Sequence, residues 1–150
     1  MDNTQLKIVI KKLIRSSSCT FLGIYPKDKI PHSFTRYPVC FIANTDVSSS
    51  KGKHWVVFYY TSQYKLEFFD SLGQSPTFYN FPLDSIVNCK FLHYPIQSTR
   101  SKLCGLYCLY YLFCKSKCKS YHSIVSTFSC NNLQINDYQL HSFFQKLNLF

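Results

Sequence analysis

A cysteine at the start of a long apolar segment is the feature that most restricts how this chain can fold. Residues 97–105 read Gln-Ser-Thr-Arg-Ser-Lys-Leu-Cys-Gly and lead into the apolar residues 106–113. This pattern predicts a buried helix with Cys104 in its first turn. The N–H groups at a helix start have no partner within the helix, and the helix dipole favours negative charge there. A thiol in this position therefore has a stabilised thiolate, and the thiolate is the nucleophile in cysteine chemistry.

A predicted hairpin in the middle of the chain brings a histidine and an acid together. Residues 54–61 form a continuous run of apolar and aromatic β-formers, which is typical of a central strand covered on both faces. Residues 64–70 follow after a short turn and indicate a second, antiparallel strand. His54 begins the first strand and Asp70 ends the second, so we expect both at the same edge of the sheet. With Gln97 as an amide donor, the chain contains the side chains that a cysteine hydrolase needs.

The remaining pattern predicts an α+β fold with one domain over residues 1–150. Apolar residues recur at helical spacing near the amino terminus, whereas residues 19–37 contain Gly and Pro and predict mostly loop. Because the strands show no regular βαβ alternation, we expect a central mixed or antiparallel sheet flanked by helices. The other expected elements are a helix containing 6–14, strands over 38–44 and 89–94, a short helix within a loop over 77–88, a helix over 104–114 and a last helix from Asn136 or Asp137.

Composition and charge narrow the class of protein. The chain has 150 residues, of which 46% are hydrophobic, and this is enough for a packed core. No window approaches the roughly 20 apolar residues of a membrane span, and the short amino-terminal apolar runs, broken by lysines, do not resemble a secretory signal. The formal net charge is +10. A basic surface either keeps molecules in solution or attracts polyanions such as DNA, here without a base-reading motif and so without sequence specificity.

Eight cysteines allow three interpretations. A disulfide framework would need an oxidising compartment, and the sequence shows no export signal. A zinc site is suggested by one cluster, but its spacings lack the two-residue separation that is common in structural zinc sites. For most of the cysteines we favour buried free thiols, which behave as small hydrophobes, and we expect no bound metal. The cluster consists of Cys104, Cys108, Cys114 and Cys118, with His122 nearby.

Four short motifs follow one another along the chain: His54-Trp55, Phe-Phe-Asp-Ser-Leu-Gly over 68–73, Gln97, and Cys-Gly-Leu-Tyr-Cys over 104–108. The glutamine stands seven residues before the first of these cysteines. This ordered set resembles the adenovirus-type cysteine proteases, which are distant relatives of the SUMO-specific proteases. The resemblance implies a papain-like or adenain-like fold with the nucleophile at a helix amino terminus. It extends over most of the chain and includes residues 5–7, 21–27, 40–45 and 139–144.

The resemblance implies a role for each residue of the motifs. Cys104 would attack the peptide carbonyl, His54 would exchange protons with the thiol and the departing amine, and Asp70 would hold the other imidazole nitrogen. Members of the family commonly have glutamate at the position of Asp70, while the SUMO-protease relatives have aspartate. Gln97 and the backbone N–H of Cys104 would form the oxyanion hole. Gly105 would let the substrate backbone approach the helix start.

Two further assignments have alternatives. Trp55 either packs beside the imidazole and the substrate or is a core aromatic. Cys89 lies in the region where the family has a cysteine that forms a disulfide with an activating viral peptide. The interval from Cys89 to Cys104 is shorter than the family pattern, so a buried structural thiol is the favoured interpretation of Cys89.

The implied function is that of a cysteine endopeptidase from a virus or virus-like mobile element, which cleaves capsid and core precursor proteins after small residues, notably glycine. The resemblance also implies a monomer that needs no cofactor for its chemistry, with a viral peptide and viral DNA as activators. Its location would be the host nucleus and the virion, without secretion or membrane insertion. Two alternatives stay open. One is a protease that removes ubiquitin-like modifiers, and the other is a non-enzymatic, basic, cysteine-rich nucleic-acid-binding protein with a structural metal.

Overall fold

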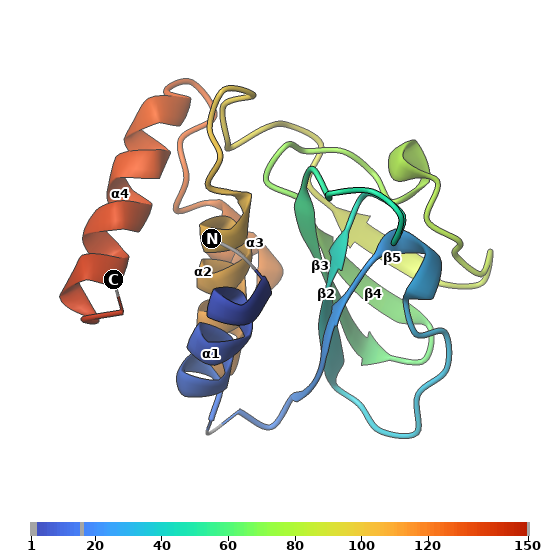
Figure 1. The fold of residues 1–150 in the computed structure, drawn as a ribbon. Coiled ribbons are helices and arrows are strands. Elements are labelled where there is room, and N and C mark those ends of the chain that lie inside the picture. Colours follow the sequence, from blue (N-terminus) through green and yellow to red (C-terminus); the bar gives the residue numbers. More distant parts are fainter. Residues whose placement is uncertain (1–2, 16, 150) are drawn as a thin grey trace.

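The computed structural model describes residues 3–15 and 17–149, in which a sheet stands beside a layer of helices (Figure 1). The strands are β1 (Thr20–Tyr25), β2 (Val39–Asn44), β3 (Trp55–Ser62), β4 (Lys65–Phe69) and β5 (Asn88–Phe91). The α-helices are α1 (Asn3–Leu13), α2 (Cys104–Ser116), α3 (Tyr121–Val125) and α4 (Leu133–Lys146). Two 3-10 helices, η1 (Lys27–Lys29) and η2 (Thr77–Tyr79), lie in the loops.

The sheet is mixed, with the strand order β1-β2-β3-β4-β5. Strand β3 runs antiparallel to both β2 and β4, while β1 pairs in parallel with β2 and β5 in parallel with β4. The predicted hairpin is confirmed as β3 and β4, with Val57 opposite Phe69. The prediction of an α+β fold with a central mixed sheet is therefore confirmed.

Strand β1 lies within residues 19–37, which the sequence predicted to be mostly loop. That prediction was wrong because Gly23 and Pro26 suggested a break, although the residues around Gly23 are mostly β-formers. In the structure Gly23 has a φ of 141°, and the pairing register of β1 shifts between Phe21 and Ile24. The glycine thus marks an irregularity in an edge strand rather than a loop.

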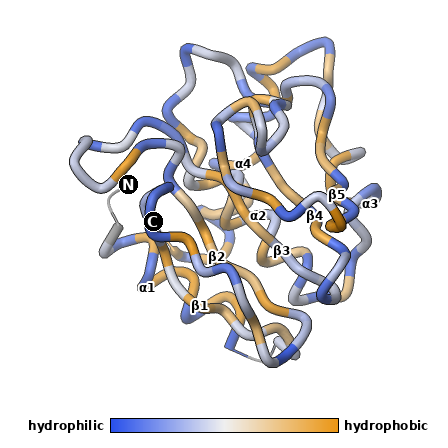
Figure 2. The backbone as a smooth tube through the Cα atoms, turned by 90° about the vertical axis from the view of Figure 1, so that its right-hand side faces the viewer, coloured by the Kyte–Doolittle hydropathy of each residue, from blue (hydrophilic) through white to orange (hydrophobic). Residues whose placement is uncertain are grey.

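The α-helices cover only one face of the sheet (Figure 1), whereas helices were expected to flank it. Residues of β2, β3 and β4 that face the helices share a core with α1, α2, α3 and α4. The opposite face is covered by loops, which contribute Ile30, Phe34 and Phe81. Prolines in these loops prevent long helices. The aromatic side chains of the same loops still exclude water from this face of the strands. Figure 2 shows the resulting hydrophobic interior along β2, β3 and α2.

Helix α4 begins earlier than the sequence predicted. Asn132 caps the helix, and its side chain accepts a hydrogen bond from the backbone N–H of Ile135. Asn136, a predicted helix start, is instead fully buried. Its side-chain amide donates to the carbonyl of Ile96 at 2.8 Å and to that of Ser129 at 2.7 Å. This asparagine therefore anchors the loop that precedes α2.

The other helices agree with the sequence pattern in part. Helix α2 begins at Cys104 as predicted and ends at Ser116, two residues beyond the expected end. The short helix α3 was not predicted, and it is capped by the Ser120 hydroxyl, which accepts from the N–H of Ser123. Across residues 3–15 and 17–149, each helix lacks the combination of length and apolar character that a membrane crossing requires.

Candidate active site

His54 and Asp70 meet at one end of β3 and β4, as the predicted hairpin implied. His54 immediately precedes β3, and Asp70 immediately follows β4. The antiparallel register brings these two strand ends to the same edge of the sheet. The imidazole Nε2 lies 2.5 Å from Oδ1 of Asp70, and both side chains are buried.

The Asp70 carboxylate is held by hydrogen bonds on both oxygens. Oδ1 also accepts from the backbone N–H of Leu72 at 2.9 Å. Oδ2 accepts from the N–H of Gln74 and from the hydroxyl of Tyr79, both at 2.9 Å. A carboxylate fixed in this way orients the imidazole and stabilises a positive charge on it.

Cys104 is the first residue of α2 and lies where the helix dipole favours an anion. The preceding residue, Leu103, occupies the cap position without a side-chain hydrogen bond to the first turn. Burial raises the pKa of the Cys104 thiol. The hydrogen bond and charge of His54, together with the backbone N–H groups of Trp55 and Gly105, outweigh burial and lower this pKa below its usual value. The surroundings of Cys104 thus favour the thiolate.

The pKa of His54 is shifted in the opposite direction. Burial lowers this pKa, but the hydrogen bonds and charges of Asp70 and Cys104 outweigh burial and raise the pKa to about 9. Because Nε2 faces Asp70, Nδ1 is the ring nitrogen that can exchange a proton with the sulfur. A thiol with a lowered pKa and an imidazole with a raised pKa favour a thiolate–imidazolium pair.

Gln97 lies in the loop before α2, and both ends of its side-chain amide are held. The residue is buried, with 2% of its surface exposed. Oε1 accepts a hydrogen bond from the Ser71 hydroxyl at 2.5 Å, and Nε2 donates to the Ser101 carbonyl at 3.0 Å. Since Ser101 stands three residues before Cys104, the amide nitrogen is held on the side of the chain that leads into α2.

A cavity of about 320 Å³ opens beside Cys104. Trp55, Leu103 and Gly105 line the cavity next to the cysteine, and side chains from α1 and α4 complete the wall. Trp55 also packs against the core on the helix side of the sheet, so it contacts both the interior and the cavity. The cavity is open to a ligand that reaches the sulfur.

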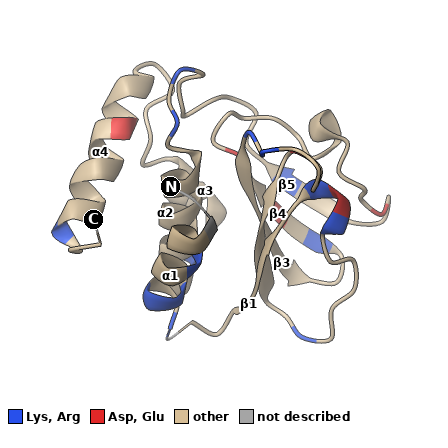
Figure 3. Ribbon diagram, in the orientation of Figure 1, with Lys and Arg blue, Asp and Glu red and all other residues tan. Residues whose placement is uncertain are grey.

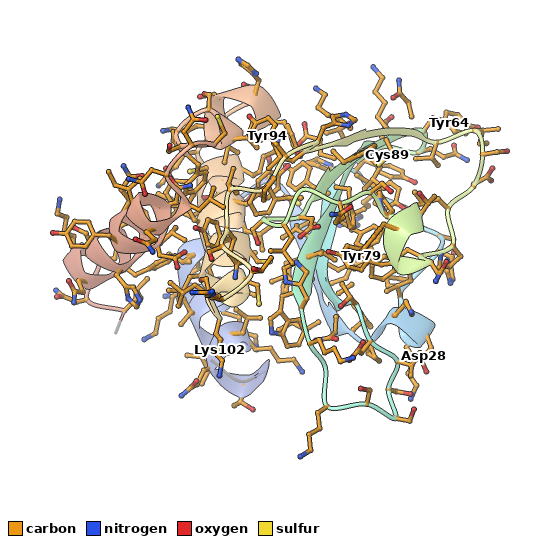
Figure 4. The ribbon with its side chains drawn as sticks, turned by 90° about the horizontal axis from the view of Figure 1, so that it is seen from above. Asp28, Tyr64, Tyr79, Cys89, Tyr94 and Lys102 are labelled. Atoms are coloured by element: carbon orange, nitrogen blue, oxygen red, sulfur yellow. The ribbon has the colours of Figure 1, made fainter. Side chains whose placement is uncertain are left out.

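Two polar residues at this site were not predicted from the sequence. Tyr79 donates to Asp70, and its ring centroid lies 6.1 Å from that of His54. Figure 4 labels Tyr79, the last residue of η2, on the side of this helix that faces the sheet. No sequence motif predicts the contact between Tyr79 and Asp70, because only the folding of the loop brings this tyrosine to the acid. For Ser71, which contacts Gln97, the available signal was its place directly after Asp70 in the Phe-Phe-Asp-Ser-Leu-Gly motif.

Cys89 lies away from this site on the edge strand β5, where Figure 4 labels it. Its side chain is half-buried and packs against the core on the loop side of the sheet. Burial raises the pKa of the Cys89 thiol to about 11. A raised pKa reduces the thiolate fraction that disulfide exchange requires. These surroundings suit a structural thiol, and the disulfide with an activating peptide stays a prediction.

The cysteines that suggested a zinc site are distributed along α2 and just beyond its end. Cys104, Cys108 and Cys114 are buried in this helix, and Cys118 is exposed beyond its end. Cys108 donates to the carbonyl of Trp55 at 3.3 Å. Within the part of the chain that the structure describes, no group of three or more His, Cys, Asp or Glu side chains is arranged to hold a metal ion.

Comparison with known proteins identifies three relatives of this chain, all adenovirus proteases, although no protein-family model matches it. The protease of ovine adenovirus D serotype 7 is 31% identical over 64% of this chain and 52% of its own length. The protease of bovine adenovirus 7 is 28% identical over 88% of this chain and 76% of its own length. The protease of bovine adenovirus 4 is 28% identical over 64% of this chain and 52% of its own length. The chain thus spans about half the length of two of these curated relatives. The resemblance that the motifs indicated is confirmed, because the chain is similar in sequence to three adenovirus proteases.

Proposed function

We propose that this chain is a cysteine endopeptidase in which Cys104 is the nucleophile, His54 the acid and base, and Asp70 the residue that orients the imidazole. One observation carries the proposal: a buried imidazole interacts with both the carboxylate and the thiol. The opposite pKa shifts of the thiol and the imidazole support the same assignment. The similarity to three adenovirus proteases supports proteolysis as the reaction.

In the first half-reaction the Cys104 thiolate attacks the carbonyl carbon of a peptide bond, and an electron pair moves to the carbonyl oxygen. The side-chain N–H of Gln97 and the backbone N–H of Cys104 donate to this oxyanion. The intermediate then collapses, the carbon–nitrogen bond breaks, and His54 gives its Nδ1 proton to the departing amine. The products are a thioester on the cysteine and a free amine.

In the second half-reaction water attacks the thioester. His54, now neutral, takes a proton from the water at Nδ1. Collapse of the second intermediate releases the carboxylic acid product and restores the thiolate–imidazolium pair. Throughout both steps Asp70 accepts from Nε2–H and stabilises the imidazolium without taking its proton.

We propose viral capsid and core precursors as substrates, with small residues such as glycine before the scissile bond. Cys104 is only 9% exposed, which leaves little room for side chains at the residue under attack. Gly105, the next residue, presents no side chain to the approaching backbone. The apolar cavity beside the cysteine can hold a neighbouring side chain of the substrate.

The proposal is tested with two peptides that differ only in glycine or isoleucine before the bond to be cut. We expect cleavage of the glycine peptide alone, and loss of turnover in Cys104→Ala and His54→Ala proteins that remain folded by circular dichroism. Cys130→Ala is the matched control, since this thiol is exposed and outside the site. Turnover by Cys104→Ala would refute the nucleophile, and equal cleavage of both peptides would refute the size selection.

A protease that removes ubiquitin-like modifiers is a second candidate, because Asp70 is the acid expected of the SUMO-protease relatives. The same narrow approach to Cys104 would accept the di-glycine end of a modifier. Cleavage of a modifier fused to a reporter at a rate well above that of viral precursor peptides would favour this candidate.

Non-specific DNA contact is the proposed role of the high positive charge. Figure 3 shows lysine and arginine on α1, near the start of α2 and along the sheet side, rather than in one patch. Binding of this kind weakens as salt displaces the condensed ions, so we expect affinity to fall steeply between low and physiological salt. Equal affinity for duplexes of unrelated sequence is the expected result, and a sequence preference would contradict it.

The infected nucleus and the virion, which contain viral DNA, are the proposed places of action.

A further inference from the structure

Ser71 connects the strand end that carries the acid to the loop that carries the oxyanion donor. It directly follows Asp70 and is 1% exposed. Its backbone carbonyl accepts hydrogen bonds from the N–H groups of Ile96 and Gln97, both at 2.9 Å. Its hydroxyl donates to Oε1 of Gln97 at 2.5 Å. One buried serine thus binds both the backbone and the side chain of Gln97.

The direction of the Gln97 amide follows from the chemistry of its neighbours. The Ser101 carbonyl can only accept, so the end of the amide that faces it at 3.0 Å must be the NH₂ group. The opposite end is then the carbonyl oxygen, and the Ser71 hydroxyl, which can donate, satisfies it. One hydrogen of Nε2 is used on Ser101, and the second is available for a substrate oxygen.

We propose that Ser71 is a positioning residue that keeps the Gln97 amide in the orientation that the oxyanion hole requires. If the amide turned over, its carbonyl oxygen would face the developing negative charge and repel it. Two contacts oppose this rotation: the Ser101 carbonyl, which can only accept, would face the amide oxygen, and the hydrogen bond from the Ser71 hydroxyl to Oε1 would be lost. This inference rests on the proposed peptidase function, in which Gln97 touches the reacting oxygen.

The arrangement also links two parts of the site. Asp70 and Ser71 are adjacent in sequence, and their side chains point to different partners, the imidazole of His54 and the amide of Gln97. One turn after β4 therefore sets both the proton-transfer group and the oxyanion donor. A shift of this turn would displace both groups together.

The test is a double-mutant cycle of Ser71→Ala and Gln97→Ala, measured with the glycine peptide. Removing one oxyanion donor typically lowers kcat by about 10²–10³, so we expect that range for Gln97→Ala. For Ser71→Ala we expect a loss of about tenfold or more in kcat with KM unchanged. In the Gln97→Ala background the same change is expected to have almost no further effect, because Ser71 acts through Gln97.

Alkylation of Cys104 by iodoacetamide is the second readout, since this reaction forms no oxyanion. We expect its rate to be unchanged in Ser71→Ala. An equal loss of kcat in both backgrounds, or a parallel loss of alkylation, would show that the serine is merely structural and would overturn the inference. So would a Ser71→Ala protein with wild-type kcat.

Two controls separate the possible failures. Should Ser71→Ala not fold, Ser71→Cys decides, because a thiol has a similar shape but is a far weaker hydrogen-bond donor than a hydroxyl. Its kcat is expected to fall with alkylation unchanged, and a wild-type kcat would overturn the inference. If the wild-type protein cleaves no peptide although Cys104 is alkylated, the proposed function fails. If the wild type is active and Ser71 is silent, only the positioning role fails.

Discussion

Replacing Asp70 by asparagine changes one atom of the site and removes its negative charge. Of the two amide orientations, the better one keeps an oxygen toward His54 and turns the NH₂ group toward Tyr79, whose hydroxyl can accept as well as donate. The N–H of Gln74, which binds Oδ2 in the wild type, then loses its acceptor. The geometry is largely kept, while the imidazole loses the charge that stabilises its protonated form.

The expected magnitude follows from the pKa of His54. Its rise from 6.5 to about 9 corresponds to about 3 kcal/mol of net interaction in the folded protein. Since the folded pKa exceeds the unfolded pKa, this stabilisation is complete below about pH 6.5 and is lost as the pH rises through about 9. The unpaired N–H of Gln74 adds a cost of about 1–3 kcal/mol that does not depend on pH.

The assay combines an NMR titration of His54 with urea unfolding at several pH values. For Asp70→Asn we expect the His54 pKa to fall by about 2 units or more, because burial then acts with little opposition. The loss of stability relative to wild type is expected to be largest near pH 6 and to shrink by up to about 3 kcal/mol above pH 9. Asp84→Asn, at an exposed acid, is the matched control. An unchanged His54 pKa in Asp70→Asn would refute the reasoning.

Three further predictions concern the support of the site. Gly73→Ala should destabilise the protein by at least about 2 kcal/mol in urea, because Gly73 has a φ of 74° and an added Cβ would lie 2.3 Å from the carbonyl carbon of Tyr94; unchanged stability would contradict this contact. Asn136→Ala should lower the free energy of unfolding by about 2–4 kcal/mol, since the Asn136 amide donates to the carbonyls of Ile96 and Ser129. A loss of stability below about 0.5 kcal/mol would argue against a buried hydrogen-bond network. Treatment with a chelator should leave the melting temperature unchanged, because the described residues offer no metal site; a lower melting temperature together with released zinc would support the nucleic-acid-binding alternative.

The parts of the fold with a strong local pattern could be predicted from the sequence. The runs that became β3 and β4 are apolar, rich in β-formers and separated by a short turn, so both strands and their antiparallel pairing followed. The pairing in turn placed His54 beside Asp70, although they are 16 residues apart. The apolar run after Cys104 likewise fixed the start of α2.

The parts that depend on one capping or packing residue could not be predicted. Helix α4 starts at the cap provided by Asn132, whereas Asn136, which looked like a start, is buried against the loop before α2. Strand β1 escaped prediction because Gly23 is tolerated at the edge of a sheet. In the site, Tyr79 reaches Asp70 only after the loop around η2 has folded, so no spacing in the sequence could show this contact.

The central claim is that His54 holds Cys104 as a reactive thiolate. The most direct measurement is labelling with an electrophile attached to a peptide that ends in Gly-Gly, near neutral pH, followed by mass spectrometry of all eight cysteines. We expect modification of Cys104 alone in the wild type, and a large loss of labelling rate in a folded His54→Ala protein. Modification of another cysteine, or an undiminished labelling rate without His54, would contradict a thiolate held by His54.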